Sequence, residues 1–210
     1  MTARDPEPIC DPTALVADTA RLGAPGRRLQ QGDWDRCGRP TTIGARCEIK
    51  DFCVVGEEAE IRAGAVLDCY SWVDVAAIVG TDALLTNRAS VGARAVVGDR
   101  CIIAAHICER SRVGAGSRVF GSLIHRQLNP TTAWDAPESQ EQSPTLEEDV
   151  FVGWGASVVG GVVVGPGSYV CAGALVTQDV KPGMIVFGVN GICRPEDWPG
   201  PLGESPFFDR

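Results

Sequence analysis

The chain has 210 residues, a formal net charge of -8 and a pI near 4.8. This acidic balance argues against nucleic acid or an anionic membrane as a partner. The sequence has neither a basic leader with an apolar run nor a stretch of about 18 apolar residues that could span a membrane. With 44% hydrophobic residues, the length fits one cytoplasmic domain with a substantial core.

The first 42 residues lack the regular repeat that follows and are expected to form an N-terminal extension. Apolar residues within residues 12–22, with Asp11 as a plausible cap, predict one short helix that ends in the Gly- and Pro-containing residues 23–26. We expect this extension to cover the open end of the repeat domain. A substrate-binding role is the alternative.

An aliphatic residue occurs at every sixth position between residues 43 and 103. The series is Ile43, Ile49, Val55, Ile61, Leu67, Val73, Val79, Leu85, Val91, Val97 and Ile103, and Ala, Ser or Cys stands four residues after each of the first ten. Neither a helix of period 3.6 nor a strand of period 2 produces this spacing. A three-sided prism does, with one short strand per face and one aliphatic side chain inward per strand, as in β-helices.

Three of the nine cysteines, Cys47, Cys53 and Cys101, stand at the small position of this repeat. A free thiol there acts as a compact apolar group. The odd number of cysteines and the absence of an export signal also favour reduced thiols over a disulfide scaffold.

The period shifts at position 109, where Glu109 stands in place of an aliphatic residue. It restarts two residues early, at Ile107, Val113 and Val119, and a polar stretch then covers residues 125–145. The series returns as Leu146, Val152, Val158, Val164, Val170 and Val176. We therefore expect a prism over residues 43–180, interrupted by a loop at 125–145 and followed by a C-terminal tail over 181–210.

Three segments near the end of the repeat carry a family resemblance. They read Val-Gly-Trp-Gly-Ala at 152–156, Gly-Gly-Val-Val-Val-Gly at 160–165 and Ala-Gly-Ala-Leu-Val-Thr-Gln-Asp-Val at 172–180. With the preceding repeats, they resemble the hexapeptide-repeat acyltransferases, in the branch of sugar and xenobiotic O- or N-acetyltransferases. The resemblance covers residues 43–194.

This resemblance implies an all-β, left-handed parallel β-helix and an enzyme that uses acetyl-CoA or another acyl-CoA as co-substrate. The acyl group would pass to a hydroxyl or amine of a small molecule, such as a sugar or a natural product, without a metal. It also implies a homotrimer with active sites between neighbouring prisms.

Such a transfer needs a base near neutral pH, for which imidazole is well suited. Of the two histidines, His125 opens the long loop, where the resemblance places the catalytic histidine; the alternative is a polar residue that ends a strand. His106 lies at the register shift and is expected to fill a bulge, so it is the second candidate base. Five carboxylates in and beside the loop are candidate partners of the base, namely Asp135, Glu138, Glu141, Glu147 and Glu148.

The resemblance also assigns contacts to acyl-CoA. Gly155 and Ala156 would offer backbone amides beside the pantetheine, one of them as an oxyanion donor. Ala172 and Gly173 would permit close backbone approach.

Further contacts are expected at the nucleotide end and at the acceptor. Thr177 matches the family's threonine at the nucleotide end, and Gln178 stands where the family often has lysine. Lys181 or Arg194 would then supply a cation for the 3'-phosphate. Asn129, Trp134 and Trp154 are candidate acceptor contacts, with a subunit-interface role as the alternative for Trp154.

Two other functions are alternatives for a chain with this repeat. A γ-type carbonic anhydrase shares this fold but needs three histidine ligands, and the chain has only two histidines. A non-catalytic structural or assembly protein would need neither a long loop beginning at His125 nor the Val-Thr-x-Asp-Val segment. Titration with acetyl-CoA separates this last class from the transferases.

Overall fold

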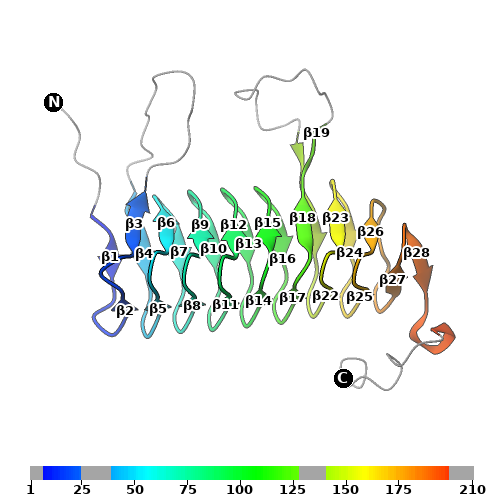
Figure 1. Cartoon of the computed structure of the whole chain (residues 1–210), viewed down its shortest axis with the longest axis horizontal. Coiled ribbons are helices and arrows are strands. Elements are labelled where there is room, and N and C mark those ends of the chain that lie inside the picture. Colours follow the sequence, from blue (N-terminus) through cyan, green and yellow to red (C-terminus); the bar gives the residue numbers. More distant parts are fainter. Residues whose placement is uncertain (1–6, 25–38, 128–140, 199–210) are drawn as a thin grey trace.

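Short parallel strands, stacked in three sheets, form the three faces of a prism (Figure 1). The computed structural model describes residues 7–24, 39–127 and 141–198. Face A contains β1 (Ile9–Cys10), β4 (Thr42–Ile43), β7 (Glu60–Ile61), β10 (Ile78–Val79), β13 (Val96–Val97), β16 (Arg112–Val113), β21 (Thr145–Leu146) and β24 (Val163–Val164). Face B contains β2 (Leu15–Val16), β5 (Glu48–Ile49), β8 (Val66–Leu67), β11 (Leu84–Leu85), β14 (Ile102–Ile103), β17 (Arg118–Val119), β22 (Phe151–Val152), β25 (Tyr169–Val170), β27 (Ile185–Phe187) and β28 (Gly191–Cys193).

Face C contains β3 (Arg21–Ala24), β6 (Val54–Gly56), β9 (Trp72–Val73), β12 (Ser90–Val91), β15 (His106–Ile107), β18 (Ser122–Ile124), β23 (Ser157–Val159) and β26 (Leu175–Val176). The chain runs from face A to B to C in each coil, so the prism has an A–B edge, a B–C edge and a C–A edge. A separate antiparallel ribbon, β19 (Arg126–Gln127) with β20 (Glu141–Gln142), leaves the C–A edge. Within the described residues, no helix is long and apolar enough to cross a membrane.

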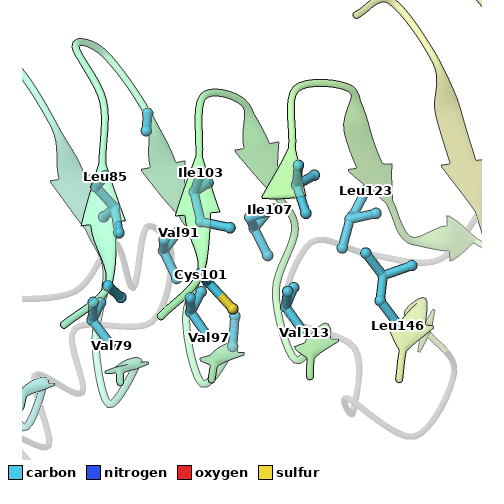
Figure 2. Close-up of a cluster of buried hydrophobic side chains, with 14 of the residues drawn as sticks. Val79, Leu85, Val91, Val97, Cys101, Ile103, Ile107, Val113, Leu123 and Leu146 are labelled. Atoms are coloured by element: carbon cyan, nitrogen blue, oxygen red, sulfur yellow. The ribbon is translucent and has the colours of Figure 1, made fainter. Parts of the chain in front are cut away.

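The core consists of the aliphatic series predicted from the sequence. Each of these side chains points inward and is at most 2% exposed, and Figure 2 shows Val79, Leu85 and Val91 among them. The small residues at the corners are buried beside them, Cys101 included, and burial raises the pKa of the Cys101 thiol to about 11. The described cysteines are free. The predicted parallel β-helix is therefore confirmed.

The predicted N-terminal helix is wrong, because residues 9–24 form a coil of the prism. β1, β2 and β3 pair in parallel with β4, β5 and β6. Cys10, Val16 and Leu22 lie opposite the inward residues of the next coil at the same spacing of six, and Ala14 and Ala20 occupy the small positions between them. At the other end, β27 adds a parallel strand to face B and β28 folds back against it, followed by a 3-10 turn (Pro195–Asp197).

The register shift predicted after Ile103 is a shortened corner, and a second one follows. The inward residues Ile103 and Ile107 are four positions apart, as are Val119 and Leu123. Both shortened corners lie on the B–C edge. The inward residue of β18 is therefore Leu123, and His125 lies two residues beyond it.

The glycines that follow the inward residues of face A permit the coils to stack closely. A Cβ atom added at Gly80 would clash with Gly98 and lie 2.6 Å from the backbone nitrogen of Asp99. We expect Gly80→Ala to lower the free energy of unfolding by about 3 kcal/mol, because the backbone of the next coil must shift. Gly167→Ala is the control: its φ is +66°, and no atom lies within 4 Å of the added Cβ.

In Gly167→Ala, the only expected cost is that of placing alanine in the left-handed backbone conformation. This cost lowers the free energy of unfolding by about 1–2 kcal/mol. Urea unfolding of both variants measures the difference. A larger loss in Gly167→Ala than in Gly80→Ala would contradict the stacking argument.

Candidate active site

His125 lies on the C–A edge, where the chain leaves face C for the long loop. Its Nδ1 atom is 3.1 Å from Oε2 of Glu109, and the side chains are 28% and 43% exposed. Glu109 occupies the same edge in the preceding coil, because Ile107 of β15 pairs with Leu123 of β18 and each residue lies two positions further on. An imidazole and a carboxylate from adjacent coils are thus brought into contact.

The stem of the loop is held against this pair. Ser143, just after β20, donates from its hydroxyl to the backbone carbonyl of Glu109 at 2.6 Å. On the other side, the Arg126 side chain lies over Gly160, where an added Cβ would be 3.3 Å from the Cβ of Arg126. Gly161 is approached in the same way by Gln142. The glycines of the following coil therefore leave room for the ribbon that carries His125.

The contact between His125 and Glu109 is one of ion-pair distance. A carboxylate this close to Nδ1 favours the tautomer that carries its proton on Nδ1 and leaves Nε2 able to take a proton from another molecule. Glu109 was not among the carboxylates predicted from the sequence as partners of the base, where it marks only a break in the period. Of the predicted partners, Glu147 and Glu148 follow β21 and lie on the A–B edge. Asp135, Glu138 and the side chain of Glu141 lie outside the described residues.

His106 does not fill a bulge, contrary to the expectation. The corner before it consists of Ala104 and Ala105, and His106 lies in β15 with an exposed side chain. Its Nδ1 atom is 2.8 Å from the hydroxyl of Ser90 in the adjacent strand of face C. It lies on the outer surface, separate from His125 and Glu109.

The residues assigned to pantetheine gather on the B–C edge. Gly155 and Ala156 precede β23, and Ala172 and Gly173 occupy the same edge in the next coil, where the amide of Gly173 donates to the carbonyl of Trp154 at 2.9 Å. Ala156 is 1% exposed and its amide donates to Gly153, so of the two expected amides Gly155 is the better oxyanion candidate. No atom lies within 4 Å of a Cβ added at Gly173, which leaves an open surface there.

Trp154 stands beside these glycines as part of an aromatic cluster. Its side chain is 64% exposed, and its ring centroid is 5.2 Å from that of Phe120. Phe120 contacts Phe151, which stacks on Tyr169 at 4.5 Å. An exposed ring supported by three others provides a firm apolar surface on this edge.

The remaining assigned residues lie apart from this group. Thr177 is on the C–A edge, where its amide donates to the Asn190 side chain at 2.8 Å and its hydroxyl accepts from the same side chain at 2.7 Å. Lys181 lies on the A–B edge, and Arg194 follows β28, 3.6 Å from Glu196. Asn129 and Trp134 lie outside the described residues. A single chain therefore does not bring the expected acyl-CoA residues together.

Comparison with known proteins agrees with this architecture. A family model described as the hexapeptide repeat of succinyl-transferase matches residues 88–120 and 145–178. The bifunctional protein GlmU of Paraburkholderia phymatum is 27% identical over 207 residues, which covers 86% of this chain and 44% of the relative. GlmU of Burkholderia thailandensis is 28% identical over 195 residues, with 82% and 42% coverage.

Among solved structures, the Francisella novicida UDP-N-acetylglucosamine acyltransferase is similar with a TM-score of 0.53 and 16% identity, over 88% of this chain and 70% of that one. The chain carries the hexapeptide repeat of this family model over residues 88–120 and 145–178, and its fold is a left-handed parallel β-helix. It spans less than half the length of the GlmU proteins it matches.

Proposed function

We propose that the protein is an acyl-CoA-dependent acyltransferase in which His125 is the general base and Glu109 orients it. The acceptor is a hydroxyl or amine of a small molecule, such as a sugar or a natural product. The observation that carries the proposal is the 3.1 Å contact between His125 and Glu109 at the mouth of the loop. The similarity in fold to a structure named as an acyltransferase supports it.

In the proposed reaction, Nε2 of His125 removes the proton from the acceptor while the acceptor oxygen or nitrogen attacks the thioester carbonyl carbon. A backbone amide at Gly155 stabilises the resulting oxyanion. The tetrahedral intermediate then collapses, the carbon–sulfur bond breaks, and the imidazolium returns the proton to the departing thiolate of CoA. The enzyme forms no covalent intermediate.

This reaction requires residues from two chains. Gly155 precedes β23 of face C, whereas His125 follows β18 of the same face. A strand rises about 3.3 Å per residue, so the two ends of these three-residue strands are roughly 10 Å apart. We therefore include a homotrimer in the proposal, with each site formed between neighbouring prisms.

A turnover assay tests the proposed function. The purified protein is incubated with acetyl-CoA and a panel of amino sugars, sugar hydroxyls and hydroxylated antibiotics, and released CoA is quantified by chromatography, which avoids interference from the protein's own thiols. Acceptor-dependent release supports a transferase. A protein that neither releases CoA nor binds acetyl-CoA by calorimetry would instead be a non-catalytic structural protein.

Glu109→Gln tests the orienting role. An amide keeps the size of the side chain but removes the charge that favours the productive tautomer, so we expect kcat to fall roughly 10- to 100-fold, the range found when the partner of a metal-bound histidine is removed. The KM for acetyl-CoA and the melting temperature should stay unchanged. Glu148→Gln, at an exposed carboxylate on another edge, is the matched control. Equal kcat values for the two variants would refute the role of Glu109.

A further inference from the structure

In three full corners of the B–C edge, the amide of the third of four corner residues donates to the preceding corner. The third residue has a left-handed backbone, and the acceptor is the carbonyl of the second residue of the corner before it. The pairs, with N···O distances of 2.9–3.2 Å, are Tyr70 with Asp51, Arg88 with Cys69, and Gly173 with Trp154. The N–H of a third residue therefore points along the edge toward the preceding coil.

Gly155 lacks such an acceptor because the corner before it is shortened. It is the third residue of the corner 153–156, and its φ of +70° is left-handed as well. The preceding corner contains only Phe120 and Gly121, between the inward Val119 and the outward Ser122, so the carbonyl at its second position is missing. Within the part of the chain that the structure describes, the Gly155 amide makes no hydrogen bond. The shortened corner thus leaves this N–H open.

The open amide indicates how the thioester of the proposed reaction lies on the edge. An N–H that points toward the shortened corner can donate to the thioester carbonyl oxygen and to the oxyanion formed from it. In the proposed reaction, the pantetheine arm lies at Ala172 and Gly173, in the coil that follows Gly155. The sulfur and the acyl chain leave the carbonyl carbon in different directions. The acyl chain is therefore directed away from this following coil, toward Phe120 in the preceding one.

The ring of Trp154 borders this same space and is held there by other rings. It leans toward the preceding coil, because its centroid lies 5.2 Å from that of Phe120. Phe120 in turn contacts Phe151 at 5.6 Å, and Phe151 stacks on Tyr169 at 4.5 Å. Because each ring supports the next, Trp154 can swing aside only by giving up these aromatic contacts.

We propose that Trp154 limits the length of the acyl group, so that the protein transfers acetyl groups and excludes longer acyl chains. Acetyl adds only a methyl group beyond the carbonyl carbon at Gly155. Each further methylene has to displace the Trp154 ring from Phe120, which is as unfavourable as overpacking an apolar interior. The inference rests on the proposed function, since it concerns the acyl donor of that reaction.

The preference between two thioesters tests the inference. With one acceptor, kcat/KM is measured for acetyl-CoA and for hexanoyl-CoA. We expect the wild-type enzyme to favour acetyl-CoA at least about 10-fold, since a single methylene can be worth that much, and Trp154→Ala to lose this preference. The Kd of free CoA, measured by calorimetry, should not change. Trp72→Ala removes another exposed tryptophan, in β9 on face C, and as the matched control should keep the wild-type preference.

Two further variants separate the ring from its support. Trp154→Phe keeps an aromatic ring that can rest on Phe120, so it should retain most of the preference for acetyl-CoA. Phe120→Ala leaves Trp154 in place but removes the ring that supports it, so it should weaken the preference. This variant also keeps the test decisive if Trp154→Ala does not fold. Circular dichroism checks that each variant is folded.

The other outcomes tell the inference and the proposed function apart. An active wild-type enzyme whose preference is the same in Trp154→Ala would overturn the inference alone, as would a wild-type enzyme that favours hexanoyl-CoA. If Trp154→Ala changes the oligomeric state by light scattering and leaves the preference unchanged, Trp154 is a subunit-interface residue and the inference is wrong. If the wild-type protein releases CoA from neither thioester with any acceptor of the panel, the proposed function and the inference both fail.

Discussion

His125→Ala is expected to lower kcat by about 10²- to 10⁴-fold, the usual contribution of a general base. Acetyl-CoA affinity should change little, because the imidazole acts on the acceptor proton mainly in the transition state. Steady-state kinetics with an acceptor from the panel gives kcat, and calorimetry gives the affinity for acetyl-CoA. The side chain is partly exposed on an edge, so the variant should remain folded.

His106→Ala is the matched control, since it removes the other histidine of the chain. His106 is exposed and contacts Ser90, so its loss should cost about 1 kcal/mol of stability or less and leave kcat unchanged. If His106→Ala abolishes turnover and His125→Ala does not, the base is His106. If both variants retain full activity, histidine catalysis is wrong for this protein.

Leu85→Ala is expected to lower the free energy of unfolding by about 2–5 kcal/mol, because it opens a cavity in a close-packed interior. Leu85 is 0% exposed inside the prism, where it pairs with the inward residues Leu67 and Ile103 of the two adjoining coils. Figure 2 shows it with Ile103. Its neighbour Leu84 points outward from the same strand, so Leu84→Ala should cost less than about 1 kcal/mol. Guanidinium unfolding measures both variants.

The same pair tests the assignment of the two sides of the strand. Leu84 and Leu85 are the same residue type in the same strand, and they differ only in whether the side chain points out of the prism or into it. Equal losses of stability in the two variants would show that the alternation between inward and outward positions is incorrect.

The inward residues were predictable from the sequence because the prism places one of them at every sixth position. The first coil does not show this spacing, because Cys10 stands at an inward position in place of Ile, Leu or Val, and residues 25–41 separate Leu22 from the uninterrupted series. The small residues Ala14 and Ala20, four positions after Cys10 and Val16, were the signal that could have revealed it.

The position of His125 at the mouth of the loop was predictable, but its contact with Glu109 was not. That contact joins residues 16 positions apart, and it exists because the second shortened corner moves the inward position from residue 125 to Leu123. Leu123 stands only four positions after Val119, so the spacing of six does not select it. The pairing of β15 with β18 shows that it is the inward residue.

The coils near the N-terminus all have the same length and the same register. On face A, residues 42, 60, 78 and 96 pair in succession, each 18 positions after the last. Because each coil of a solenoid contacts only its neighbours, excision of residues 62–79 would leave Ile61 followed by Gly80 in an unchanged corner position and shorten the prism by about 4.8 Å. Duplication of the same segment would lengthen it equally. The number of coils, and with it the length of the prism, can therefore change by engineering or during evolution while the coils that carry His125 and Gly155 remain unchanged.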